Sequence, residues 1–414
     1  MMASAVRDVL FRNYPRVLVD RFVIGRSMRT LMIFLSVTLA LSACMYTPER
    51  ASNAEEADHA LIAGYGEIRA YRYSPRNEAL ARHSDWMVKT QSAKKNILMI
   101  SSGGGSGAFG VGVLAGWTTT NTRPRFDVVT GVSTGALIAP YAFLGPAYDK
   151  LLVHQYTSGV AQELVALNGP LGLFGSSLLK AGPLKRHVER FITPHVLNQI
   201  AAEHHEGRRL FVLTTNLDTQ RGVIWNMGAI AASENPDALK LFRDVIVASA
   251  SVPGVFPPVQ IQAVSNGRQF QELHSDGGSI SQVLTPPLLV ENALFSERQV
   301  QRNVNLYVIV NNALIPEFDI TPNRTVPALG RAYSLFLKSQ AQSELTALYN
   351  HTRRTGASFH VASIEVQVPY SMLNPLSKKY MQAVYRFGYE QAASGTLWKD
   401  TPAFPLQLSQ PLAR

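Results

Sequence analysis

Short apolar runs alternate with longer helical patterns from residue 96 towards the C-terminus. The runs predict buried strands at residues 97–100, 126–130, 210–214 and 305–310. Apolar or amphipathic stretches of helical length predict helices at residues 108–117, 136–144, 183–203, 238–250 and 332–349. Because the two kinds of element alternate, the sequence predicts an α/β domain in which helices flank a mostly parallel sheet.

The first 94 residues have a different character. Residues 31–43, LMIFLSVTLALSA, form an uncharged apolar run that is short for a bilayer span and typical of a secretory signal. Residues 44–94 are mostly polar and lack a strong apolar period, so we expect a tether with one or two peripheral helices. The predicted organisation is a signal peptide over 1–43, this tether, an α/β domain over 95–395 and a C-terminal tail over 396–414.

Cys44 is the only cysteine, which excludes a disulfide or a cysteine-based zinc cluster within one chain. Together with the preceding Leu-Ser-Ala at 41–43, it resembles the lipobox of bacterial lipoproteins, in which the signal is cleaved before the cysteine and the cysteine is acylated. An uncleaved anchor is the alternative. The resemblance implies an exported, membrane-anchored lipoprotein, and Met45 after the cysteine favours the outer membrane of a Gram-negative cell. The signal is most compact if translation begins at Met28.

Charge and composition narrow the function classes. The formal net charge is +10, but residues 1–43 hold six Arg and two Asp, which leaves about +6 for the remainder. No run of basic residues interleaved with aromatic residues marks a nucleic-acid site, so we predict no nucleic-acid partner. A hydrophobic fraction of 46% is ample for a buried core.

The first candidate catalytic motif is GVSTG, residues 131–135, between a predicted strand and an apolar helix. A serine on such a sharp turn projects its hydroxyl outwards, and Gly131 and Gly135 permit the crowded backbone. The N-terminus of the following helix favours the negative charge of a developing oxyanion. The motif by itself is common, but its position between strand and helix predicts Ser133 as a nucleophile.

A glycine-rich loop, SSGGGSG at 101–107, follows the strand predicted at 97–100. Consecutive glycines leave amide N–H groups free to converge on an anion, and a βαβ connection places this loop at the same sheet edge as Ser133. The candidate residues of an oxyanion hole are Gly103, Gly104 and Gly105. A dinucleotide fingerprint, GxGxxG at 105–110, is the alternative, but the acidic residue expected at the end of the second strand is missing.

The third element is Asp276, followed by two glycines and preceded by the alternating segment RQFQELHS. A carboxylate at a strand end can reach a serine on a neighbouring strand and accept its proton. A plain Asp-Gly turn is the alternative.

In this order, the glycine loop, the GxSxG elbow and the Asp-Gly-Gly segment resemble the patatin-like phospholipases. Residues 214–228, TTNLDTQRGVIWNMG, and 248–259, ASASVPGVFPPV, are similar to the family as well. The resemblance covers residues 96–278, with weaker likeness out to 391. It implies a three-layer patatin-like fold and a hydrolase domain over 95–395.

The resemblance also implies roles for residues. Ser133 is the expected nucleophile, Asp276 the base and the Gly103–Gly105 backbone the oxyanion hole, with no histidine, metal or cofactor. The family often has GGGx[RK]G, whereas Ser106 and Gly107 follow the glycines here, so the choice of oxyanion amides is open by one position.

The implied activity is serine acyl hydrolysis of phospholipids or other lipids, with membrane lipid as the substrate. Two alternatives remain: a general carboxylesterase or thioesterase, and a catalytically idle lipid-binding lipoprotein on the same scaffold. No residue in the sequence indicates the preferred headgroup or acyl-chain length.

Three further patterns have less specific interpretations. His274, two residues before Asp276, raises the possibility of a Ser/His/Asp triad, although a hydrogen-bonded or exposed strand position is favoured. His204 and His205 lie beside two glutamates, but adjacent helical side chains diverge, which favours a solvated helix end over a metal site. The apolar stripe of the helix at 332–349, with Tyr333 and Phe336, favours core packing over a membrane face.

Overall fold

The computed structural model describes residues 50, 52–72, 74, 80, 83–166, 177–286, 303–316, 318, 320–370, 374–402 and 404. The predicted signal peptide and Cys44 lie outside the described residues. The described strands are β1 (Arg69–Tyr71), β2 (Lys95–Ile100), β3 (Val128–Val132), β4 (Arg209–Asn216), β5 (Arg221–Asn226), β6 (Val259–Ser265), β7 (Arg268–Asp276), β8 (Val304–Ala313) and β9 (Ser358–Ile364).

The helices flank these strands in chain order. The longer ones are α4 (Gly107–Thr119), α5 (Thr134–Leu144), α6 (Asp149–Thr157), α7 (Ala181–Phe191), α8 (Pro194–His205), α10 (Ala238–Ser249), α12 (Thr325–Thr355) and α13 (Lys378–Ala393). The shorter ones are α2 (Ala54–Asp58), α9 (Met227–Ala232), and the 3₁₀ turns η2 (Gly104–Ser106), η3 (Pro146–Tyr148), η4 (Val160–Leu164) and η6 (Gly277–Ser279). None of the helices in the described ranges combines the length and apolar character that crossing a bilayer requires.

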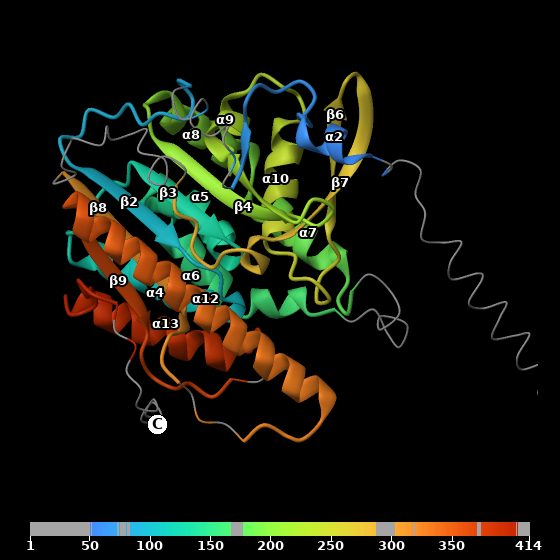
Figure 1. Cartoon of the computed structure of the whole chain (residues 1–414). Coiled ribbons are helices and arrows are strands. Elements are labelled where there is room, and N and C mark those ends of the chain that lie inside the picture. Colours follow the sequence, from blue (N-terminus) through green and yellow to red (C-terminus); the bar gives the residue numbers. More distant parts are fainter. Residues whose placement is uncertain are drawn as a thin grey trace, which may run out of the picture. The chain divides into compact units, whose positions relative to one another are not determined.

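The strands form one mixed sheet whose main path runs β1-β5-β4-β3-β2-β8-β9. The part of this path from β4 to β9 is labelled in Figure 1. The five strands β4, β3, β2, β8 and β9 pair in parallel. Strands β1 and β5 extend the sheet in antiparallel fashion, and the β6–β7 hairpin joins β4. The predicted α/β class with a mostly parallel sheet flanked by helices is therefore confirmed.

Alternating side chains on the buried strands build two separate cores. On β2, Leu98 and Ile100 join the core that α4, α5, α8, α10 and α13 cover, whereas Ile97 and Met99 face the other side. There the core includes Leu345 of α12, which crosses this face in Figure 1. Side chains therefore alternate between two cores, and helices cover both faces of the sheet, which is the three-layer arrangement that the family resemblance implies.

Several predicted elements have different bounds. The helix predicted at 183–203 is two helices, because Thr193 caps α8 by accepting a hydrogen bond from Val196 N (3.3 Å) and Pro194 begins it. The helix predicted at 332–349 extends over residues 325–355 as α12. Within the range predicted as a tether, 44–94, the structure has the short helix α2 and also β1, a strand of the sheet.

Candidate active site

Ser133 occupies a sharp turn between β3 and α5. Its backbone has φ 56° and ψ −119°, a conformation that non-glycine residues rarely adopt. The Ser133 N–H donates to Ser249 Oγ (3.0 Å), which in turn donates to the Leu213 carbonyl (2.7 Å). This chain of hydrogen bonds ties the strained turn to the end of α10 and to β4, so that the surrounding structure holds the conformation.

Gly131 and Gly135 lie at positions where neighbouring backbone atoms leave no room for a side chain. A Cβ atom at Gly131 would overlap the Gly135 carbonyl, and one at Gly135 would overlap the carbonyl of Ile100, at the end of β2. A side chain at either position would therefore push the elbow apart.

Strands β3 and β7 meet end to end along the same edge of β4. Strand β3 pairs with β4 up to the partners Val132 and Leu213. From Thr214 onwards the neighbour of β4 is β7, which pairs through Asp276 itself. Because β3 ends where β7 begins to pair with β4, Ser133, the residue after β3, and Asp276, the last residue of β7, face each other.

Ser133 and Asp276 are in direct contact. Ser133 Oγ donates a hydrogen bond to Asp276 Oδ2 over 2.5 Å, and both residues are buried. The other carboxylate oxygen accepts from Gly278 N over 2.6 Å, and a Cβ at Gly277 would overlap the carbonyl of Leu213. In the Asp-Gly-Gly segment, Gly277 thus lies against β4, and the Gly278 amide holds one carboxylate oxygen while the other accepts from the serine.

Burial raises the pKa of Asp276 to about 7, although the hydrogen bonds from Ser133 and Gly278 N act to lower it. A carboxyl group with a pKa in this range is a stronger base than an exposed aspartate and can still be ionised near neutral pH. The pair can therefore exchange one proton along the existing hydrogen bond.

The glycine-rich loop lies beside the elbow. A Cβ at Gly107 would overlap the Thr134 hydroxyl, so the end of the loop touches the residue after Ser133. Within the part of the chain that the structure describes, no acceptor takes the N–H groups of the three candidate glycines, Gly103, Gly104 and Gly105. Gly104 has φ 53° and opens the turn η2. The loop therefore lies beside the elbow and has three amide donors without an acceptor among the described residues, which is compatible with binding an anion.

Asn311, at the end of β8, supports this loop and was not predicted from the sequence. Its N–H donates to Ser101 Oγ (2.8 Å), and its side chain donates to the Ser101 carbonyl (3.0 Å) and accepts from Gly110 N (3.0 Å). Gly110 lies within α4, and a Cβ there would approach the Asn311 side chain within 2.6 Å. Packing against Asn311 thus accounts for the third glycine of the GxGxxG pattern.

Gln282 joins three parts of the site and was also not predicted. Its Oε1 accepts from Ser102 Oγ in the glycine-rich loop, and its Nε2 donates to the Gly278 carbonyl (2.7 Å) and to Gln340 Oε1 of α12 (3.1 Å). Glu344 of α12 accepts from the Gln282 N–H (3.0 Å). Only the folded chain brings these segments together, so no local pattern marks Gln282.

His274 is buried, but both ring nitrogens have partners other than Ser133. Nδ1 lies 3.0 Å from Thr214 Oγ1, and Nε2 lies 3.1 Å from Glu272 Oε2. Because Trp225 Nε1 donates to the Thr214 hydroxyl (2.8 Å), that hydroxyl can donate to Nδ1, which leaves Nε2 protonated towards Glu272. The geometry places His274 in a structural network and not in a triad.

The remaining candidates have structural roles. His204 is buried beside Gly228 and Arg209, which corrects the prediction of a solvated helix end, while Glu203 forms ion pairs with Arg125 and Arg208. Among the described residues, no three His, Cys, Asp or Glu side chains are grouped to hold a metal ion. The stripe of α12 is buried at Leu345 and Leu348, but Tyr333 and Phe336 are exposed, so the core-packing interpretation is wrong for its N-terminal half.

Comparison with known proteins gives a match to one protein family. The family model of patatin-like phospholipase matches residues 98–289. A sequence search of curated proteins found no match. Among solved structures, VipD from Legionella pneumophila aligns with a TM-score of 0.39 and 11% identity over 75% of this chain and 69% of its own. The type III effector protein ExoU aligns with a TM-score of 0.22 and 14% identity over 76% of this chain and 56% of its own.

Proposed function

We propose that this protein is a serine acyl hydrolase that cleaves fatty-acyl esters of membrane lipids, which is supported by the match of residues 98–289 to the family model of patatin-like phospholipase. Ser133 is the nucleophile and Asp276 the general base in this proposal. The observation that carries it is the 2.5 Å hydrogen bond from Ser133 Oγ to Asp276 Oδ2.

The proposed reaction is acyl transfer in two halves. As Ser133 Oγ bonds to the ester carbonyl carbon, its proton moves to Asp276 Oδ2, and the Gly103–Gly105 amides bind the oxyanion. The intermediate collapses, the ester C–O bond breaks, and the leaving alkoxide takes the proton from Asp276. Water then attacks the acyl-enzyme, gives a proton to Asp276 and releases the fatty acid, while the proton returns to Ser133.

The test is release of fatty acid from phospholipid vesicles and from nitrophenyl esters of increasing chain length. We expect Ser133→Ala and Asp276→Asn each to lower kcat/KM by a factor on the order of 10³ or more. Ser394→Ala and Asp400→Asn, at exposed positions, are the matched controls and should retain activity. Undiminished hydrolysis in either site variant would refute the dyad.

The same assay distinguishes the alternatives. Hydrolysis of short-chain esters alone would indicate a general carboxylesterase, and activity on thioesters alone would indicate a thioesterase. A folded wild-type protein with no activity on any acyl substrate would favour the idle lipid-binding scaffold.

We further propose that the protein is exported and anchored by acylation of Cys44, in the outer membrane of a Gram-negative cell. This rests on the apolar run at 31–43 and the Leu-Ser-Ala-Cys sequence at its end. Mass spectrometry of the mature N-terminus tests it: a diacylglyceryl cysteine is expected in the wild type and none in Cys44→Ser. An intact N-terminus ahead of Cys44 would instead indicate an uncleaved anchor.

A further inference from the structure

Gln282 is a fully buried amide that touches both halves of the proposed catalytic site. Its Oε1 accepts from Ser102 Oγ, and its Nε2 donates to the Gly278 carbonyl (2.7 Å) and to Gln340 Oε1 (3.1 Å). The amide oxygen and both amide protons therefore have protein partners, as the burial of a polar side chain requires. Because every one of these bonds is directional, the side chain fixes the relative positions of the groups that it joins.

The bonds at Ser102 hold the start of the glycine-rich loop. Besides the bond from its hydroxyl, Ser102 N donates to the Gln282 carbonyl (3.0 Å). The next residue is Gly103, the first of the candidate oxyanion glycines, and a Cβ there would overlap the Asn311 carbonyl of β8. The loop is thus fixed by Gln282 and by the end of β8, directly before the amides that the proposed reaction uses.

The bond at Gly278 connects Gln282 to the proposed base. Gly278 N donates to Asp276 Oδ1 (2.6 Å), and the carbonyl of the same glycine accepts from Gln282 Nε2. A Cβ atom at Gly278 would lie 2.8 Å from Asp276 Oδ1 and 3.3 Å from the Cβ of Ser102. The base and the glycine-rich loop therefore meet at Gly278, and the amide of Gln282 joins the two sides.

Glu344 of α12 holds the segment that carries Gln282. Its Oε2 accepts from the N–H groups of Gln282 (3.0 Å) and Val283 (2.9 Å), and its Oε1 accepts from Ser281 Oγ (2.6 Å). Hydrogen bonds to a carboxylate are stronger than those between neutral groups. Three of them on consecutive residues leave the backbone at position 282 little freedom to move.

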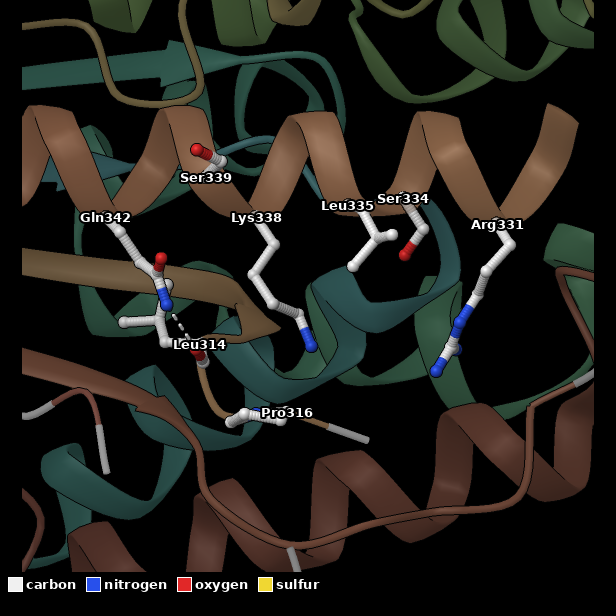
Figure 2. A pocket seen from close by; sticks show the side chains of 8 residues that line it. All are labelled: Leu314, Pro316, Arg331, Ser334, Leu335, Lys338, Ser339 and Gln342. Atoms are coloured by element: carbon white, nitrogen blue, oxygen red, sulfur yellow. Dashed lines mark hydrogen bonds between the residues drawn. The ribbon is translucent and has the colours of Figure 1, made fainter. Parts of the chain in front are cut away.

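Helix α12 is itself fastened to the segment that follows β8. Figure 2 shows Gln342 pointing from α12 to Leu314, and its Nε2 donates to the Leu314 carbonyl (2.7 Å). Lys338 Nζ donates to the Ile315 carbonyl (2.6 Å). The same strand supports the glycine-rich loop through Asn311, so α12 and the loop are held by one end of β8.

We propose that Gln282 is a positioning residue of the proposed reaction: it fixes the glycine-rich loop relative to Asp276, so that the amide donors and the base act together on Ser133. The inference rests on the function proposed above and acts through Ser102 and Gly278, not on the substrate itself. Oxyanion donors are effective only if they are in place before the charge develops, and a displacement of about 1 Å can lower the rate about 100-fold.

Three variants of the full chain test this role. Gln282→Met keeps the length of the side chain and removes its three hydrogen bonds, whereas Ser102→Ala removes only the bond from the Ser102 hydroxyl. The matched control is Gln382→Met on α13, because Gln382 also donates through its Nε2 to a backbone carbonyl, that of Thr157 (2.9 Å). Urea denaturation first establishes that each variant is folded.

Two inhibitors separate the chemical step from binding. An alkyl trifluoromethyl ketone is attacked by Ser133 Oγ, whose proton passes to Asp276, and the adduct carries an oxyanion. The corresponding trifluoromethyl carbinol has the same shape but cannot be attacked. An analogue of the transition state weakens in parallel with the loss of rate, whereas a ligand that resembles only the substrate does not.

For Gln282→Met we expect kcat/KM for a nitrophenyl ester to fall about 100-fold and the Ki of the ketone to rise by a similar factor. For Ser102→Ala we expect changes of about tenfold, because a single buried hydrogen bond is lost. The Ki of the carbinol should stay within about twofold in both variants, and Gln382→Met should change none of the three values. Because Ser102 and Gln282 share one bond, the double variant should be no slower than Gln282→Met alone.

The proposal would be overturned by unchanged kcat/KM in Gln282→Met, by equal weakening of ketone and carbinol, by equal losses in Gln382→Met, or by fully additive effects in the double variant. If Gln282→Met does not fold, Ser102→Ala decides: an unchanged Ki of the ketone would overturn the proposal. A wild-type protein that neither cleaves the ester nor prefers the ketone to the carbinol would refute the proposed function and the role of Gln282 with it. An active wild type with an unaffected Gln282→Met variant would refute the role of Gln282 alone.

Discussion

At the scale of single residues, Asp276 is subject to opposing influences. Burial raises its pKa to about 7, and hydrogen bonds from Ser133 and from the Gly278 amide oppose that rise. In the proposed mechanism Asp276 must be ionised to accept the serine proton, so we expect kcat/KM to be constant above pH 7 and to fall about tenfold per pH unit below it. A pH profile with a soluble nitrophenyl ester measures this.

The pH profile needs two controls, one for the substrate and one for the enzyme. The ester should be one whose own ionisation does not change between pH 5 and pH 9, and the residual rate of Asp276→Asn should show no inflection near pH 7. A wild-type profile that stays flat down to pH 5 would contradict the assignment of Asp276 as the titrating base.

Gly135 offers a prediction about the elbow itself. A Cβ at this position would overlap the Ile100 carbonyl, a backbone atom with little freedom to move. We expect Gly135→Ala to lower the free energy of unfolding by about 3 kcal/mol, measured by urea denaturation. Gly66→Ala is the matched control, because nothing lies within 4 Å of a Cβ there. Equal stability of the two variants would mean that the elbow is less tightly packed than the structure indicates.

At the scale of elements, a buried ion pair fastens β1 to the strand that carries Asp276. Arg69 contacts both carboxylate oxygens of Glu272, at 2.5 and 3.2 Å, and donates to the Ala60 carbonyl (2.7 Å). Burial raises the pKa of Glu272, but Arg69 and His274 outweigh it and hold the value at about 2. The pair therefore remains ionised in the folded protein at neutral pH.

Removal of one partner should be more harmful than removal of both. We expect Arg69→Ala to lower the free energy of unfolding by about 3–5 kcal/mol, because it leaves the Glu272 charge buried without the opposite charge of Arg69. Arg69→Met combined with Glu272→Met should recover much of that loss. Urea denaturation of the three proteins measures the difference, and a double variant that is as unstable as Arg69→Ala would show that the loss comes from packing.

The parts of the fold that the sequence predicts are those with a local signal. The strands at 97–100 and 210–214 are short apolar runs, and Ser133 and Asp276 lie in glycine-bounded motifs. Strands β5 and β9 were not predicted. Strand β1 lies in a polar segment, and it joins the sheet only by pairing with β5. The break before Pro194 has a local signal, a threonine followed by proline, and could have been predicted.

The parts that could not be predicted depend on tertiary contacts. Nothing near Gln282 or Asn311 indicates that these side chains join the glycine-rich loop to α12 and to β8. The arrival of β7 where β3 ends on β4 depends on strand register, which the sequence does not specify across such distances. For α12 the period is visible, but only the structure distinguishes the buried Leu345 from the exposed Phe336.

At the scale of the whole molecule, the buried carboxyl group at the proposed site affects the stability of the entire fold. An aspartate in the unfolded chain has the ordinary pKa of 3.8, whereas Asp276 in the folded protein has a pKa of about 7. Between these values the folded protein binds the additional proton. The stabilisation from this group is therefore complete below pH 3.8 and is lost as the pH rises through 7.

We therefore expect Asp276→Asn to gain stability relative to the wild type as the pH rises from 5 to 8, by a change in the free energy of unfolding on the order of 2–3 kcal/mol. The comparison between the two proteins matters, because His187 and His204, whose pKa values burial lowers to about 4, alter the stability of both proteins equally over this range. Urea denaturation at intervals between pH 5 and pH 8 gives the difference directly. Parallel stability curves would mean that Asp276 ionises at its ordinary pKa and is not the base that burial has tuned. A difference that grows with pH would show that the buried carboxylate is held at the expense of stability, as expected of a group placed for catalysis.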